Sequence, residues 1–133
     1  MSTIKVDTIQ SRGGGAVTLT NQNAAKAWVN FNGTGTIAAR DSFNVSGLVD
    51  NGGGDYTTSF TSSFSNSDYS FNGTSSGDSG NYGYLFMKGP VNNEFVYATS
   101  SLRLSTGYAS ATNSTATARD AHQVNSSIHG DLA

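Results

Sequence analysis

The sequence FNVSGLVDNGGGDYTTSF, residues 43–60, contains two runs in which apolar and polar residues alternate. The residues of like parity are Phe43, Val45 and Val49 in the first run and Tyr56, Thr58 and Phe60 in the second. A period of two is that of a β-strand, and the Gly-rich loop between the runs is typical of a turn. This stretch predicts an antiparallel hairpin and indicates an all-β fold.

The composition of the whole chain agrees with that fold class. Its 133 residues include 20 Ser, 15 Thr, 13 Asn and 16 Gly, while only 12% are charged, so uncharged groups supply the polarity. A disordered chain has few aromatic residues, whereas this one has 7 Phe, 6 Tyr and 1 Trp. β-branched and aromatic residues favour strands, and Gly, Asn and Ser favour turns. We therefore expect one ordered β domain.

Further strands and turns are predicted on both sides of this hairpin. Residues 4–7 and 17–19 are expected to form two short strands, and one helical turn is expected within residues 21–27. Trp28–Phe31 and residues 34–39 are expected to pair through a type I′ turn at Asn32-Gly33. Short strands joined by surface loops are expected between residues 59 and 80. The later predicted strands are residues 82–87, 94–98, 102–105 and 124–129.

These elements predict a single antiparallel β-sandwich or jelly-roll-like domain over residues 27–133. Residues 1–26 are expected to form an N-terminal attachment or oligomerisation segment with a short strand. The strand at Tyr82–Met87 is apolar on both faces, so a second layer or another subunit is expected to cover both faces. Together with the family resemblance given at the end of this subsection, this strand leads to the expectation of a trimer.

Charge and cysteine content exclude several classes of function. The net charge is −2 and the seven Lys and Arg residues are scattered, so no nucleic acid is expected as a partner. The absence of Cys excludes disulfides and thiolate metal sites. No signal peptide is expected, and without an apolar run of about 20 residues, neither is membrane insertion.

No pattern typical of a catalytic site is found. Most of the nine acidic residues lie beside Gly, Ser or Asn, where Asp commonly stabilises turns. The Gly-x-Ser-x-Gly motif of hydrolases is absent, and the glycine runs at 13–15 and 52–54 lack the strand-to-helix context of phosphate-binding loops. We expect no enzyme activity and no cofactor.

Two weak binding candidates remain. The aromatic-rich polar stretch from Tyr69 to Tyr84 has the composition of glycan-binding surfaces, with Tyr69, Asn81 and Tyr82 as candidate receptor-binding residues. Packing of these rings in a core or subunit interface is the favoured alternative.

The second candidate combines Asp120-Ala121-His122 with His129-Gly130-Asp131, where each His and Asp is expected to share one face of a strand. On a three-fold axis, His122 and His129 would bind a metal ion shared by all chains. Solvent-exposed turn residues are the favoured alternative.

Three segments at the N-terminal side, Ile4–Gln10, Gly15–Thr20 and Ala24–Thr36, resemble a block found in tail-fibre and other appendage proteins of bacteriophages. The resemblance continues to Tyr56, and the ending Gly130-Asp131-Leu132-Ala133 is similar to theirs. It implies a structural virion protein, usually homotrimeric, that is assembled in the host cytoplasm and attaches to the particle through its N-terminal part. The partners that it implies are other virion proteins and a host-surface glycan. Because the chain has no shaft repeats, a capsid decoration or neck protein without receptor binding is the alternative.

Overall fold

The computed structural model describes residues 11–13, 24–76, 84–87, 97–110 and 113–133. This part of the chain forms strands and irregular segments and has no helix, so the all-β prediction is confirmed. In the same residues, no helix has the length and apolar character needed to cross a membrane. The strands are β1 Ala27–Asn32, β2 Ala38–Phe43, β3 Val45–Gly52, β4 Asp55–Phe60, β5 Ser70–Ser76, β6 Tyr84–Met87, β7 Tyr97–Ala98, β8 Ser101–Ser110, β9 Asn113–Ala118 and β10 Gln123–His129.

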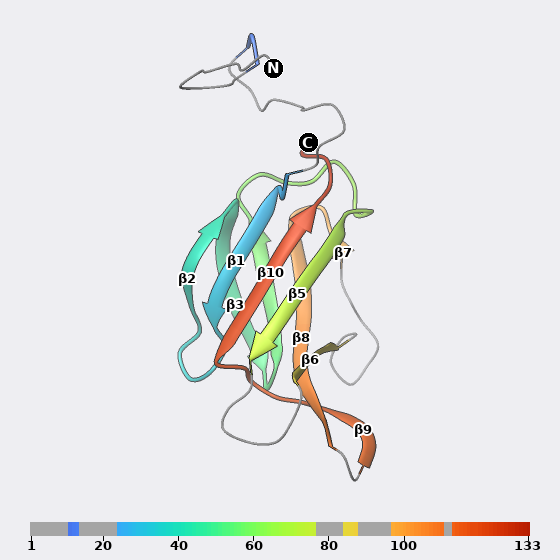
Figure 1. Ribbon diagram of the computed structural model, residues 1–133. Helices are drawn as coiled ribbons and strands as arrows, with labels where there is room; N and C mark the ends of the chain where they lie inside the picture. Colours follow the sequence, from blue (N-terminus) through green and yellow to red (C-terminus); the bar gives the residue numbers. More distant parts are fainter. Residues whose placement is uncertain (1–10, 14–23, 77–83, 88–96, 111–112) are drawn as a thin grey trace, which may run out of the picture.

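The strands form two antiparallel sheets. The first has the order β2-β1-β10-β5, so the N-terminal and C-terminal strands of the sandwich are neighbours at its centre. The second has the order β3-β4-β8-β6, and β7 and β9 also pair with the long strand β8. Figure 1 shows the first sheet in front of strands β3 and β8. This arrangement is consistent with the predicted β-sandwich.

The core lies between the sheets because strands of both sheets alternate buried and exposed residues. Along β1 the side chains of Ala27, Val29 and Phe31 are buried, and the residues between them are partly exposed. Along β10, Val124 and Ile128 are buried in the same way. The inward side chains of the second sheet that meet them are Tyr56, Thr58 and Phe60 of β4 and Leu102 and Leu104 of β8.

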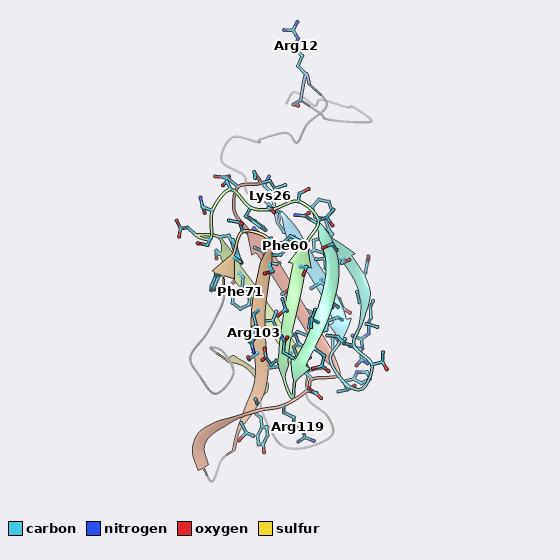
Figure 2. The ribbon with its side chains drawn as sticks, turned by 180° about the vertical axis from the view of Figure 1, so that it is seen from behind. Arg12, Lys26, Phe60, Phe71, Arg103 and Arg119 are labelled. Carbon is cyan, nitrogen blue, oxygen red and sulfur yellow. The ribbon has the colours of Figure 1, made fainter. Side chains whose placement is uncertain are left out.

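An aromatic cluster fills one end of the core. Phe64 lies 4.9 Å from Phe60 and 4.7 Å from Tyr69 between ring centroids, and Tyr69 lies 5.1 Å from Tyr97. Phe64 also bridges to Leu132, which ties the C-terminal end of the chain to this cluster. Figure 2 shows Phe60 at the same end of the sandwich as Lys26, the residue before β1.

The predicted hairpin at residues 43–60 is confirmed. Strands β3 and β4 pair through a turn at Gly53-Gly54, where Gly54 has a φ of +69°. Gly54 is necessary there because a β-carbon would lie 2.5 Å from the Arg119 nitrogen and still closer to the Thr106 carbonyl oxygen. Phe43 belongs to β2, and Asn44, with a φ of +55°, separates the two strands.

The turn predicted at Asn32-Gly33 is wrong. Strands β1 and β2 do pair, but residues 33–37 form a five-residue loop between them. The Asn32 side chain accepts hydrogen bonds from the Thr34 amide and hydroxyl, and Gly33 does not adopt positive φ. Glycine is required at this position for a different reason: the β-carbon of any other residue would lie 2.5 Å from the Tyr56 hydroxyl oxygen.

Other sequence predictions had mixed outcomes. The helical turn within residues 21–27 is not found in its described part, residues 24–27, where β1 already begins at Ala27. The polar stretch after residue 59 contains β5, an edge strand, as its polarity indicated, whereas β9 was not predicted. The strands at 102–105 and 124–129 are confirmed within β8 and β10, and β6 and β7 cover parts of 82–87 and 94–98. Strands 4–7 and 17–19 lie outside the described residues.

Candidate functional site

An open groove of about 520 Å³ lies on the outer face of the first sheet, over β1, β10 and β5. This volume is within the range of about 300–1,000 Å³ that is usual for small-molecule sites. The face is turned toward the viewer in Figure 1. The residues that line the groove are Trp28, Val29, Asn30, Asn72, Gly73, Thr74, Asn125, Ser126 and Ser127.

The alternation of the strands determines which side chains face the groove. Since Val29 and Ser126 point into the core, their neighbours in β1 and β10 point outward. Strand register then places the outward-facing residues of β1, β10 and β5 in two rows. Each row crosses three strands, a distance of about 10 Å. One row is Trp28, Ser127 and Asn72, and the other is Asn30, Asn125 and Thr74.

Hydrogen bonds connect the second row into a ladder that extends to β2. The Arg40 guanidinium donates through Nη1 to Oδ1 of Asn30 at 3.4 Å. Asn30 Nδ2 donates to Oδ1 of Asn125, and Asn125 Nδ2 donates to Oγ1 of Thr74 at 3.2 Å. Arg40 is itself held by a 2.8 Å hydrogen bond from Nη2 to the carbonyl oxygen of His122. The ladder therefore runs across all four strands of the sheet.

The described residues that line the groove offer hydrogen-bonding and aromatic groups but no side chain suited to acid–base catalysis. The described residues that line it carry no charge and include no Asp, Glu, His, Lys or Arg. They offer one partly exposed indole ring, amides and hydroxyls. An aromatic face contacts the C–H groups of a sugar, and amides hydrogen-bond its oxygens. A neutral, oxygen-rich ligand fits this chemistry.

Of the three predicted receptor-binding residues, only Tyr69 lies within the described part of the chain. Its ring is 5% exposed, and its hydroxyl donates to the carbonyl oxygens of Ala98 and Ser101 at 3.2 and 3.0 Å. Burial raises the pKa of Tyr69 to about 12. Tyr69 is thus part of the aromatic cluster and offers little surface to a ligand. Asn81 and Tyr82 lie outside the described residues.

His122 and His129 do not come together within the chain. His129 ends β10 and His122 lies just before it, so about 20 Å of strand separates them. The expected strand geometry is wrong for both pairs, because Asp120-Ala121-His122 precede β10 and Gly130-Asp131 follow its last residue, His129. In the described part of the chain, no group of three or more His, Cys, Asp or Glu residues is close enough to hold a metal. A site shared between subunits stays a prediction.

Asp120 instead belongs to a cluster that fixes the end of the sandwich opposite the aromatic residues. Its Oδ1 accepts hydrogen bonds from the Gly54 amide at 2.6 Å and from the Tyr56 hydroxyl at 3.2 Å. The Gly33 carbonyl oxygen, at 2.9 Å, is a second acceptor within reach of the single hydrogen of this hydroxyl. Desolvation by burial raises the pKa of Tyr56 to about 12. These contacts join the β1–β2 loop and the segment between β9 and β10 to strand β4. Asp120 therefore has a structural role.

Sequence reasoning missed the residues of the groove. The alternation along β1 and β10 was a sufficient signal that Trp28 and Asn125 face away from the core. Their proximity was not predictable, because it depends on the pairing of strands almost a hundred residues apart in sequence. Comparisons of the chain with protein-family models, curated proteins and solved structures found no match.

Proposed function

We propose that this chain is a non-enzymatic β-sandwich module of a bacteriophage particle, in a tail fibre or a related appendage, that binds a neutral glycan on the host surface. The observation that carries the glycan part is the groove, where Trp28 shares a row with Ser127 and Asn72 and lies next to a second row of uncharged amides and hydroxyls. This combination offers ring stacking together with hydrogen bonds, and the described lining has no charge that would favour an ionic ligand.

The virion part of the proposal is supported by the resemblance of residues 4–56 and of the C-terminal four residues to phage appendage proteins. In that setting the chain is a homotrimer that attaches through residues 1–26 and contacts other virion proteins. An open groove gives weak binding at each site, and three-fold symmetry with many copies per particle multiplies it. Avidity is therefore the mechanism of attachment.

The glycan proposal is tested with purified full-length protein on immobilised host-surface glycans, followed by titration of the sugars that bind. Trp28→Ala is expected to weaken binding by about tenfold. This factor corresponds to the loss of about 1.4 kcal/mol of binding free energy from one stacking contact. Val49→Ala is the matched control, because Val49 is 50% exposed but belongs to the second sheet. Equal loss in both variants, or no binding by the wild type, would contradict the proposal. Incubation with the glycan is expected to release no oligosaccharide.

The virion proposal is tested by mass spectrometry of purified particles and by light scattering of the isolated protein. We expect the protein in the particle and a mass three times that of the chain. Absence from particles or a stable monomer would refute the corresponding part. Cryo-electron microscopy could instead locate the protein on the capsid or neck, and the free protein could fail to compete with particles for host adsorption. Together, these two results would replace the host-attachment proposal with that of a capsid decoration or neck protein.

A further inference from the structure

We propose that the binding site continues from the groove onto Phe43 of β2, and that its ligand is a linear chain of several sugar residues that crosses the strands. This inference rests on the proposed glycan function and specifies the form of the ligand. It comes from the register of the first sheet, which places Phe43 beside Trp28 on the groove face.

The groove runs across the strands and not along them. Its lining consists of three rows, each with one residue from β1, β10 and β5. The middle row is Val29, Ser126 and Gly73, and the side chains of Val29 and Ser126 are buried in the core. The backbone of this row therefore forms the floor of the groove, and the side chains of the two outer rows form its walls. A ligand that follows the floor crosses the strands.

The row that contains Trp28 extends to the edge of the sheet at Phe43. Strand β2 pairs with β1 in regular register from Trp28 to Asn30, and the bulge lies beyond Asn30. Residues directly opposite each other in an antiparallel pair have their side chains on the same face of the sheet. Phe43 is opposite Trp28, so its side chain also faces outward. Its exposed fraction of 52% agrees with this position.

With Phe43 included, one half of this row is aromatic and the other half is polar. Phe43 and Trp28 lie on neighbouring strands and offer two successive surfaces for the C–H groups of a sugar chain. Ser127 of β10 and Asn72 of β5 continue the row with a hydroxyl and an amide. The row crosses four strands, a distance of about 14 Å, which exceeds the length of one sugar ring. A linear chain of about three sugar residues fits this length.

The place of Phe43 favours contact with the ligand over contact between subunits. Exposed apolar side chains can mark either kind of interaction site. In the described part of the chain, the large apolar side chains with the greatest exposure are Phe43, Val49 and Tyr97. Val49 and Tyr97 belong to strands of the second sheet, whereas Phe43 shares the face of the groove and the row of Trp28. Its neighbours are therefore those of the proposed glycan site.

The test measures the affinity of the full-length protein as a function of ligand length. The probes are fragments of one to four sugar residues, released by partial acid hydrolysis from the host-surface glycan that binds and titrated by NMR. We expect affinity to rise by about tenfold from one to three residues and to change little beyond, because a single sugar contacts only part of the row. Phe43→Ala is expected to weaken binding of the three-residue fragment by about fivefold and binding of the single sugar by less than about twofold.

Two further variants at Phe43 separate ring stacking from a general apolar effect. Phe43→Trp keeps an aromatic face and is expected to bind the three-residue fragment at least as well as the wild type. Phe43→Leu keeps apolar surface without a ring and is expected to lose about as much affinity as Phe43→Ala. The matched control is Val49→Ala, because Val49 is 50% exposed on the second sheet. This control is expected to keep the dependence on length.

Equal affinity of the wild type for fragments of every length would overturn this inference and leave the glycan proposal intact. Full retention of the length dependence in Phe43→Ala would contradict the role of Phe43. A change of mass in light scattering of Phe43→Ala would assign the ring to a contact between subunits and would also overturn the inference. Absence of binding to any glycan would overturn both proposals.

Discussion

Replacement of Tyr56 by Phe tests whether the buried Tyr56 hydroxyl holds the end of the sandwich. The ring is fully buried and packs edge-on against Phe31, so the substitution keeps the shape of the core. It removes the hydroxyl that donates to Gly33 and Asp120 and that accepts from the Ala121 amide at 3.4 Å. Buried partners are then left unsatisfied, which costs about 1–3 kcal/mol of unfolding free energy at neutral pH.

The pKa of Tyr56 gives this loss a dependence on pH with a definite sign. Burial raises the pKa to about 12, whereas a tyrosine in the unfolded chain ionises near pH 10. The stabilisation is complete below about pH 10 and is lost as the pH rises through 12, because the unfolded chain releases its proton first. Ionisation of this group lowers the stability of the wild type by about 1 kcal/mol at pH 11 and about 2 kcal/mol at pH 12. Tyr56→Phe lacks this contribution.

The difference in unfolding free energy between wild type and Tyr56→Phe is therefore expected to shrink from pH 8 to pH 12. Urea denaturation followed by intrinsic fluorescence measures it at each pH. Val29→Ala serves as control, because it removes buried apolar surface from β1 without changing an ionisable group. Its effect should stay constant with pH. A Tyr56→Phe effect that is equally constant would refute the assignment of a buried, neutral hydroxyl.

Two further substitutions test the turn and the ion pair of the second sheet. Gly54→Ala is expected to cost more than about 3 kcal/mol in urea denaturation, because it combines positive φ with overlap against Thr106. Gly53→Ala is its control, since a β-carbon there meets nothing within 4 Å, and an effect as large as that of Gly54→Ala would contradict this account. Arg103→Leu leaves the Asp55 carboxylate, whose side chain is 6% exposed, without the guanidinium that donates to it; Arg103 is labelled in Figure 2. We expect a loss of about 1–3 kcal/mol, and a neutral outcome would contradict the importance of the pair.

The sequence predicted most reliably where local pattern determines structure. The hairpin at residues 43–60 followed from alternation on both sides of a glycine loop, and β8 and β10 followed from short runs of the same kind. The Asn32-Gly33 turn failed because tertiary contacts decided the role of Gly33: it admits the Tyr56 hydroxyl, a contact between residues 23 positions apart. β9 was missed because its small Ser, Thr and Ala residues include no large apolar or aromatic side chain. Its strand conformation is accompanied by antiparallel pairing with β8, which the sequence of β9 alone does not indicate.

The candidate site was less predictable than the fold, for a physical reason. Sequence pattern assigns a residue to a face, but a groove is formed by register between strands. Asn30 and Asn125 are brought together by pairing of β1 with β10, and Thr74 joins them through β5. Arg40 reaches this row because of a bulge. None of these pairings is a local property of the chain, so composition alone directed attention to Tyr69, which is part of the core.

The same ladder explains how a chain with so few charges can present an oriented binding surface. Free amides on an exposed sheet rotate, and each rotation exchanges a donor for an acceptor. Here Arg40 donates to Asn30 and Asn30 donates to Asn125, so two amides are held in one orientation while the described lining stays uncharged. An uncharged, open surface binds one sugar weakly and with little dependence on salt. On the proposed function, attachment through this surface would depend on multiple copies acting together, so competition by the free protein is expected to increase steeply with its valency.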